Sequence, residues 1–192
     1  IARAIDDLDQ CFSIITALLR IGEIENARRR VGFSLVDLNE IAADIVDLYE
    51  PIAETRQIRL ELLAASGPVP VHGDRDLLIE VLANLIDNAL KFTDEGGDVT
   101  LAAFADGQGS ARLEIADTGI GIMPQERQAV LNRFYRSDKS RHVPGSGLGL
   151  SLVSAILRLH NAQLTISNAR QHDERPGALF GVTFPPPAQA VF

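Results

Sequence analysis

Apolar side chains recur every three or four positions along the first thirty residues. They stand at Ile1, Ile5, Leu8, Phe12, Ile15 and Leu19. This spacing places them on one seam of an α-helix, and such a seam packs against another helix. No N-cap residue precedes the pattern, so we expect the sequence to begin inside a longer helix. Arg28, Arg29 and Arg30 favour a helix end there, because cations suit the last turn of a helix; a binding patch is the alternative.

Beyond Gly32, strand-like and helix-like patterns alternate. Strands are predicted at residues 33–36, 58–62, 69–72, 99–105, 111–117, 163–168 and 179–184. One helix, with Asp37 as its N-cap, either ends near Pro51 or is kinked there. A second helix, capped by Asp74, spans 75–92, and a third spans 148–160. Turns at 94–97 and 106–109 separate neighbouring elements. This order predicts an α/β fold: a two-layer sandwich in which helices cover one face of a mixed sheet, preceded by the long N-terminal helix.

Composition narrows the class of protein. The length of 192 residues suits one domain with an appended element. Lys and Arg number 18 against 26 Asp and Glu, a net charge of −8 that disfavours nucleic acid and anionic membranes as partners. The single cysteine, Cys11, cannot close an intrachain disulfide, and no apolar run is long enough to span a bilayer. We therefore expect no nucleic-acid partner, no membrane contact by this chain, and a cytoplasmic location, whether or not the parent protein is anchored in the inner membrane.

Three polar side chains share one stripe of the helix predicted at 75–92. Asn84, Asn88 and Lys91 are spaced four and three residues apart and fall within an arc of about 60°. They lie beside a continuous apolar face, at the edge of the buried side. Because Asn is a poor helix former, something other than helix stability selects the two amides. A ligand pocket is one explanation, and hydrogen bonds to neighbouring loops are the other.

Two glycine-rich motifs follow the stripe. The first, Asp117, Thr118, Gly119, Ile120, Gly121 and Ile122, comes directly after a strand. Its carboxylate could accept a hydrogen bond from an exocyclic amine such as that of adenine, while the glycines let the backbone approach a planar ligand; an Asp-initiated turn is the alternative. The second motif opens a helix, where backbone N–H groups suit phosphate. It comprises Gly145, Ser146, Gly147, Leu148, Gly149 and Leu150, and it has neither a P-loop ending nor the chain position of a Rossmann fingerprint.

The segment between these motifs is basic. Residues 126–142, here called the lid segment, carry Arg127, Arg133, Arg136, Lys139 and Arg141 against Glu126 and Asp138, a local balance of 5 − 2 = +3. A glycine-bounded cationic stretch is typical of a mobile lid over a polyphosphate, and a solvated loop is the alternative.

Taken together and in this order, the motifs resemble those of the catalytic ATP-binding domain of bacterial sensor histidine kinases. DNA gyrase, heat-shock chaperone ATPases and mismatch-repair ATPases share that fold. Residues 84–92 resemble the N box, 117–122 the first glycine box, 134–136 the F box and 145–150 the second glycine box. Residues 1–30 are similar to the second helix of the dimerisation and phosphotransfer hairpin, which leaves 31–188 as the kinase catalytic domain.

The resemblance implies ATP and Mg²⁺ as ligands and assigns roles to individual residues. Asn88 would hold Mg²⁺, Asn84 would position the triphosphate, and Lys91 would neutralise phosphate oxygens. Asp117 would bind the adenine amino group, with Gly121 against the base and Phe92 where a tyrosine is commoner. Arg136 would lie near the γ-phosphate, and it and Lys91 are the expected catalytic residues. The remaining expected ATP contacts are Gly119, Ile122, Gly145, Ser146, Gly147, Leu148, Gly149 and Leu150.

Two departures qualify the resemblance. None of His72, His142, His160 and His172 stands in the family's acceptor context, so the phosphate-accepting histidine is expected on an upstream helix absent from this chain; His160 is instead expected to cap a helix or bond a loop. Ala178 stands where many relatives have a hydroxyl residue.

The function implied by the resemblance is transfer of the ATP γ-phosphoryl group to the upstream histidine and then to a response regulator receiver domain, in a parent that dimerises through its hairpin helices. A serine kinase of the anti-sigma-factor type and a catalytically silent scaffold are the alternatives.

Overall fold

The computed structural model describes residues 14–24, 32–63, 65, 67–106, 109–137, 145–170 and 175–186. Several predictions fall on other residues and so lie outside the described part of the chain. These are the helical seam before residue 14, Cys11, Arg28 to Arg30, His142, His172 and the lid segment from 138 onward.

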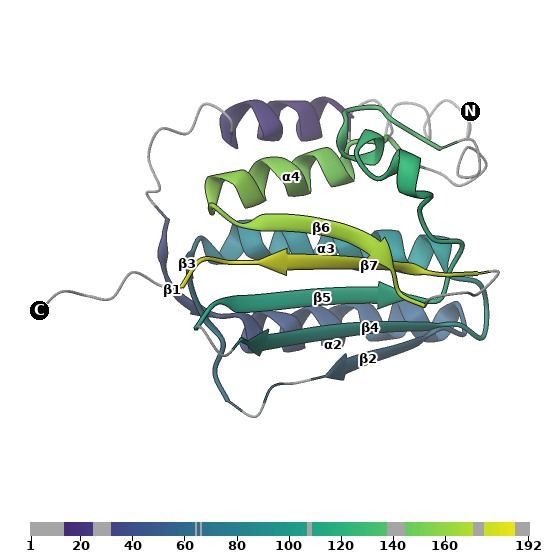
Figure 1. Cartoon of the computed structure of the whole chain (residues 1–192), viewed down its shortest axis with the longest axis horizontal. Helices are drawn as coiled ribbons and strands as arrows, with labels where there is room; N and C mark the ends of the chain where they lie inside the picture. The colour runs from purple at the N-terminus through teal and green to yellow at the C-terminus, as the bar shows by residue number, and fades with distance from the viewer. Residues whose placement is uncertain are drawn as a thin grey trace, which may run out of the picture.

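A mixed five-stranded sheet forms one layer of the molecule (Figure 1). Its order is β2 (Arg59–Leu63), β4 (Asp98–Ala105), β5 (Ala111–Asp117), β7 (Ala178–Thr183) and β6 (Gln163–Asn168). β2 runs parallel to β4, and all other pairs are antiparallel. Two further strands, β1 (Ser34–Asp37) and β3 (Pro70–Gly73), pair with each other as a separate antiparallel ribbon. The mixed sheet predicted from the sequence is confirmed.

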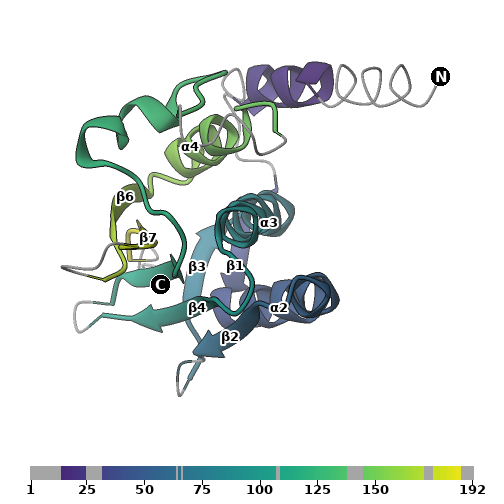
Figure 2. The same ribbon diagram turned by 90° about the vertical axis from the view of Figure 1, so that its right-hand side faces the viewer.

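Helices cover one face of this sheet, which confirms the two-layer prediction (Figure 2). They are α2 (Leu38–Thr55), α3 (Arg75–Phe92) and α4 (Gly149–Leu159). α3 contributes the largest share of the core, since Leu78, Val81, Leu82, Leu85 and Ile86 are all fully buried. α2 continues through Pro51, an exposed residue. The helix therefore does not end near the proline, and the longer predicted helix is the correct one. In the described residues no helix combines the length and the apolarity needed to cross a bilayer.

Helix starts follow the predicted caps. The Asp74 side chain accepts hydrogen bonds from the backbone N–H groups of Asp76 and Leu77 at the start of α3. Asp37 accepts one from Asn39 at the start of α2 and another from Val69, which ties α2 to the β1–β3 ribbon. After β5 the chain forms two 3₁₀ turns, η1 (Pro124–Glu126) and η2 (Ala129–Leu131).

His160 joins α3 to α4, as the cap or loop partner that the sequence predicts. The side chain is buried, with Nδ1 2.8 Å from the Ile156 carbonyl oxygen, while Nε2 accepts a hydrogen bond of 3.1 Å from the Asp74 N–H. This pair of bonds requires a neutral imidazole protonated at Nδ1. The Phe33 ring stacks on the imidazole with centroids 4.5 Å apart. His160 thereby holds the start of α3 against the end of α4, and the opposite ends of these helices are left to form the site.

Residues 14–24 form a helix that packs beside the domain (Figures 1 and 2). Ile21 and Ile24 are buried in the common core, and Arg20 is ion-paired with Glu80 of α3 at 3.5 Å. Ile15 and Leu19, which belong to the predicted seam, are 53% and 65% exposed. The helix thus has two apolar faces, of which one contacts the domain and the other, carrying Ile15 and Leu19, is exposed.

Candidate functional site

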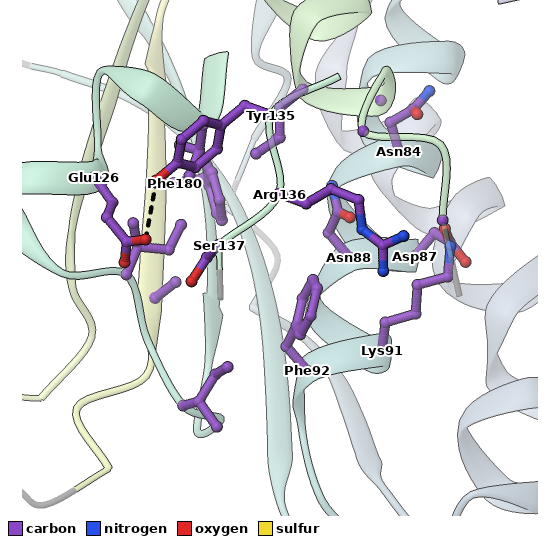
Figure 3. Close-up of a pocket in the computed structure, with 18 of the residues that line it drawn as sticks. Asn84, Asp87, Asn88, Lys91, Phe92, Glu126, Tyr135, Arg136, Ser137 and Phe180 are labelled. Carbon is purple, nitrogen blue, oxygen red and sulfur yellow. Dashed lines mark hydrogen bonds and ion pairs between the residues drawn. The ribbon is translucent and has the colours of Figure 1, made fainter. Parts of the chain in front are cut away.

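A cavity of about 360 Å³ opens between α3, the loop after β5, the lid segment and the start of α4 (Figure 3). Its size is within the range of small-molecule sites. Most of the predicted site residues line it: Asn84, Asn88, Lys91, Phe92, Asp117, Gly121, Ile122, Arg136, Gly145, Ser146, Gly147, Gly149 and Leu150. The fold therefore brings four sequence motifs, which lie between residues 84 and 150, to one place.

The amide stripe of α3 forms one wall. Asn84 donates a 2.8 Å hydrogen bond from Nδ2 to the Glu80 carbonyl oxygen, which leaves its Oδ1 directed toward Gly149. A Cβ on Gly149 would lie only 2.8 Å from that oxygen. Gly149 consequently lets α4 begin beside the stripe, and the N-terminus of α4 faces the same cavity as the amides. Positively polarised N–H groups at such a terminus suit an anionic ligand.

Lys91 forms an ion pair with Asp87, a residue that was not predicted to belong to the site. Its Nζ lies 2.5 Å from Asp87 Oδ2, and both side chains are partly exposed. Asp87 also lines the cavity. The i,i+4 spacing of Asp87 and Lys91 in the sequence could have predicted this pair. In this structure the positive charge that was expected to meet phosphate is already neutralised by a carboxylate.

Asp117 forms the opposite, buried end of the cavity. The residue is only 4% exposed, and its Oδ1 accepts hydrogen bonds from the N–H groups of Gly119 at 2.9 Å and Ala178 at 3.1 Å. Within the described part of the chain no donor contacts Oδ2. Burial raises the pKa of this carboxyl above its usual range, while the backbone bonds from Ala178 and Gly119 and the charge of Arg170 act in the opposite direction. A fixed, buried acceptor with a spare oxygen is suited to a neutral N–H donor.

Glycines allow the loops around Asp117 to meet. Gly177 has φ +61°, and a Cβ there would overlap the Asp117 carbonyl oxygen. Gly121 has φ +69°, and its Cβ would lie 2.8 Å from the Gly177 carbonyl oxygen. Gly119 packs against the backbone of Phe92 and does not line the cavity; Leu148, at 1% exposure, belongs to the core. Both residues lie within the described part of the chain, and both support the cavity-lining residues from behind.

The lid segment is fastened to the second glycine box. Phe134 donates its N–H to the Gly147 carbonyl oxygen at 2.9 Å and has φ +64°, a conformation uncommon for an aromatic residue. Gly147 has φ +71°, and a Cβ there would be 3.0 Å from the Phe134 backbone and the Tyr135 carbonyl oxygen. Figure 3 shows Arg136 directed across the cavity toward Asp87 and Lys91.

Several residues that line the cavity were not predicted from the sequence to belong to the site. They are Asp87, Ile120, Glu126, Val130, Tyr135, Ser137, Ala178 and Phe180. Glu126 and Val130 lie on the 3₁₀ turns, where no periodic pattern marked an inward face. Ala178 and Phe180 alternate with outward residues along β7, and that alternation was a usable signal.

Comparisons with known proteins agree with this geometry. Residues 73–188 match the family described as histidine kinase-, DNA gyrase B- and HSP90-like ATPase. The chain is 38% identical over 183 residues to the signal transduction histidine-protein kinase/phosphatase MprB of Mycobacterium avium (strain 104), covering 88% of this chain and 35% of that protein. It is 33% identical to Drug sensory protein A of Synechocystis sp., covering 82% of this chain and 25% of that protein. The chain thus spans about a quarter to a third of these two relatives.

Solved structures show the same fold. A mycobacterial sensor histidine kinase MprB structure has a TM-score of 0.71 at 33% identity, covering 81% of this chain and 98% of that one. Full-length ShkA in complex with AMPPNP has a TM-score of 0.80 at 27% identity, covering 94% of this chain and 36% of that one. Histidine kinase ThkA in complex with the response regulator protein TrrA has the fold at 22% identity and a TM-score of 0.72, covering 94% and 48%.

The family match covers more than half of the chain, and it includes the strand end, the helix stripe and the two glycine boxes that form the cavity. The chain belongs to the histidine kinase-, DNA gyrase B- and HSP90-like ATPases and is an ATP-binding catalytic domain of the sensor histidine kinase type.

Proposed function

We propose that this domain binds Mg·ATP in the cavity and transfers the γ-phosphoryl group to a histidine on a helix outside this chain. The observation that carries the proposal is the convergence of the α3 amides, Asp117 and the second glycine box on one cavity. Phosphoryl transfer needs mainly positioning and charge neutralisation, and this lining has groups suited to both.

The two ends of the cavity suit the two ends of the nucleotide. Asp117, with Oδ2 left over, would accept the adenine amino group, and the φ +69° backbone at Gly121 would let the base lie close. Asn84, Lys91, Arg136 and the start of α4 would receive the phosphates. The catalytic roles go to Lys91 and Arg136, because both carry charge into the phosphate end.

Mg²⁺ would be held by the Asn88 amide oxygen together with phosphate oxygens and water. The described residues contain no group of three His, Cys, Asp or Glu side chains able to hold a metal by themselves. Mg²⁺ commonly takes only one or two protein oxygens when it accompanies a nucleotide, so a single amide at the phosphate end fits. The ion supplies charge neutralisation between phosphate oxygens. Asn88→Ala is expected to remove the Mg²⁺ dependence of triphosphate binding while weak ADP binding remains; equal losses for both nucleotides would exclude this role.

The parent protein would act in two-component signalling. We propose that its phosphohistidine passes the phosphoryl group to a response regulator receiver domain, as the complex of ThkA with a response regulator suggests by analogy. We also propose that the parent is a homodimer, because Ile15 and Leu19 remain exposed on the helix that continues the predicted seam. The catalytic reaction would take place in the cytoplasm, where ATP is available.

Incorporation of labelled phosphate tests the reaction. A longer piece of the parent protein, including the sequence upstream of residue 1, would be incubated with γ-labelled ATP and Mg²⁺. We expect a label that is lost in acid and retained in alkali, as for phosphohistidine, and expect none in the Asn88→Ala version or in the 192-residue chain alone.

The other outcomes separate the alternatives. An acid-stable label would indicate a serine kinase on the same fold. ATP binding without any label in the longer protein would indicate a nucleotide-binding scaffold, and either result would overturn the proposed transfer to histidine.

A further inference from the structure

The lid segment contains a hydrogen bond that no role assigned so far requires. Tyr135 donates from its hydroxyl group to Glu126 Oε1 at 3.0 Å, and both half-buried side chains line the cavity (Figure 3). We propose that Glu126 and Tyr135 are positioning residues, which fix the backbone before Arg136 so that its guanidinium faces the phosphate end. The inference rests on the proposed function, since it concerns how that site holds a triphosphate.

Glu126 is itself anchored to the sheet. It ends η1, where its N–H donates to the Met123 carbonyl oxygen at 2.9 Å. The next residue, Arg127, donates from a terminal guanidinium nitrogen to Asn168 Oδ1 at 2.7 Å, at the end of β6. The Glu126 carboxylate is therefore a fixed point of the cavity wall.

Tyr135 is held on two sides. Its hydroxyl group reaches Glu126, and the residue before it, Phe134, is bonded to the Gly147 carbonyl oxygen at 2.9 Å. Because Phe134 has φ +64°, the backbone here adopts a sparsely populated conformation that its surroundings must maintain. The hydroxyl–carboxylate bond is one of the contacts that can do so.

Arg136 then points away from the anchor. In Figure 3 Tyr135 is directed toward Glu126, whereas Arg136 is directed across the cavity toward Asp87 and Lys91. The two consecutive side chains therefore leave the backbone in opposite directions. Fixing Tyr135 to Glu126 consequently fixes the direction of Arg136 at the phosphate end, and loss of the bond should weaken contacts to the γ-phosphate more than contacts to the base.

Nucleotide affinities of matched variants test this coupling. Affinities for a non-hydrolysable ATP analogue and for ADP would be measured calorimetrically on the 192-residue chain. We expect Tyr135→Phe and Glu126→Ala each to weaken ATP-analogue binding about two- to tenfold, with ADP binding nearly unchanged. This loss is smaller than that of a direct hydrogen bond to a charged group, because the bond acts on the nucleotide only through the position of Arg136. Glu126→Gln retains an acceptor oxygen and should restore most of the affinity.

Two further variants complete the test. Tyr49→Phe removes the only other tyrosine hydroxyl of the chain, bonded to the Ala83 carbonyl oxygen at 3.3 Å outside the cavity lining, and should leave the ratio of the two affinities unchanged. Adding Tyr135→Phe to Arg136→Ala should cause little further loss, because the positioned group is already absent. Equal losses for ATP analogue and ADP, full additivity with Arg136→Ala, or failure of Glu126→Gln to restore binding would each overturn the inference.

A measurement without nucleotide distinguishes this inference from the proposed function. Amide hydrogen exchange over residues 133–137 should be faster in Tyr135→Phe and Glu126→Ala than in the unmodified chain and in Glu126→Gln. Unchanged exchange in all variants would refute the positioning role. An unmodified chain that binds no nucleotide would instead refute the proposed site, and the exchange data would still decide whether the bond fixes the segment.

Discussion

The two ends of the cavity are constructed differently. The base end consists of strand ends and tight glycine loops, with Asp117 at 4% exposure and bonded to two backbone N–H groups. The phosphate end consists of charged side chains on α3 and the lid segment, and the ion pair between Lys91 and Asp87 there is partly exposed. The first end is complete before a ligand arrives. At the second, the proposed function would require Lys91 to exchange a carboxylate for a phosphate.

This difference indicates where a rigid structure is useful in the domain. A planar base can be recognised by a fixed carboxylate and a close backbone, because its shape does not change during the reaction. A triphosphate is charged and loses a group, so partly exposed side chains that can change partners suit it better. Substitutions at the base end should therefore act strongly on stability or on every adenine ligand, and substitutions at the phosphate end should act weakly and depend on salt.

The largest effect is expected from Gly177→Ala. Its φ of +61° and the overlap of a new Cβ with the Asp117 carbonyl oxygen add a backbone cost to a steric one, about 2–5 kcal/mol in the free energy of unfolding. Gly96→Ala is the matched control, since Gly96 has φ +79° with no atom within 4 Å of the new Cβ and should lose only about 1–2 kcal/mol. Denaturant unfolding would measure both. Equal losses would show that the base end is not closely packed.

Asp117→Asn should separate binding from stability. An amide at this position keeps an acceptor for Gly119 and Ala178 but loses the charge-assisted bond to adenine, worth about 1.5–3 kcal/mol or roughly 10- to 150-fold in affinity. Because burial raises the pKa of Asp117, the ionised carboxylate costs free energy of folding at neutral pH, and the variant should be as stable as the unmodified chain or more so. Calorimetric titration with adenosine would measure the change in affinity, and thermal unfolding would measure the change in stability. Unchanged adenosine affinity would remove Asp117 from the base site.

Asp87→Asn should have a smaller effect of opposite sign. Removing the carboxylate frees Lys91, and an exposed pair of this kind is worth about 0.2–1 kcal/mol, so ATP-analogue affinity should rise up to about fivefold. The gain should shrink at high salt. A loss of affinity, above all one that depends on Mg²⁺, would contradict this account and indicate that Asp87 helps to hold the ion.

The smallest effect is a pH dependence of adenosine binding. Adenosine has no phosphate, so its affinity reports the base end alone. The bound amino group favours the ionised carboxylate, so affinity should rise as pH increases through the raised pKa of Asp117 in the folded chain and then level off. The stability that this group contributes should fall between the ordinary Asp value of 3.8 and that raised pKa, because the folded state retains the proton longer than the unfolded chain. An identical pH profile in Asp117→Asn would contradict the assignment.

The sequence predicted what depends on local pattern. The periodic apolar residues of α3 defined its bounds, and the Asp74 cap and the Asn84, Asn88 and Lys91 stripe followed from them. Contacts between distant segments could not be predicted in this way. The positive φ of Gly177 exists because its loop crosses Asp117, and Glu126 meets Tyr135 through turns that have no repeating pattern.

The decisive experiment for the nucleotide site is calorimetric titration of the 192-residue chain with a non-hydrolysable ATP analogue, with and without Mg²⁺. We expect saturable binding of one nucleotide per chain that Mg²⁺ strengthens and that Asp117→Asn weakens. Absence of binding at millimolar nucleotide, or binding that is indifferent to both Mg²⁺ and Asp117→Asn, would contradict the proposed site.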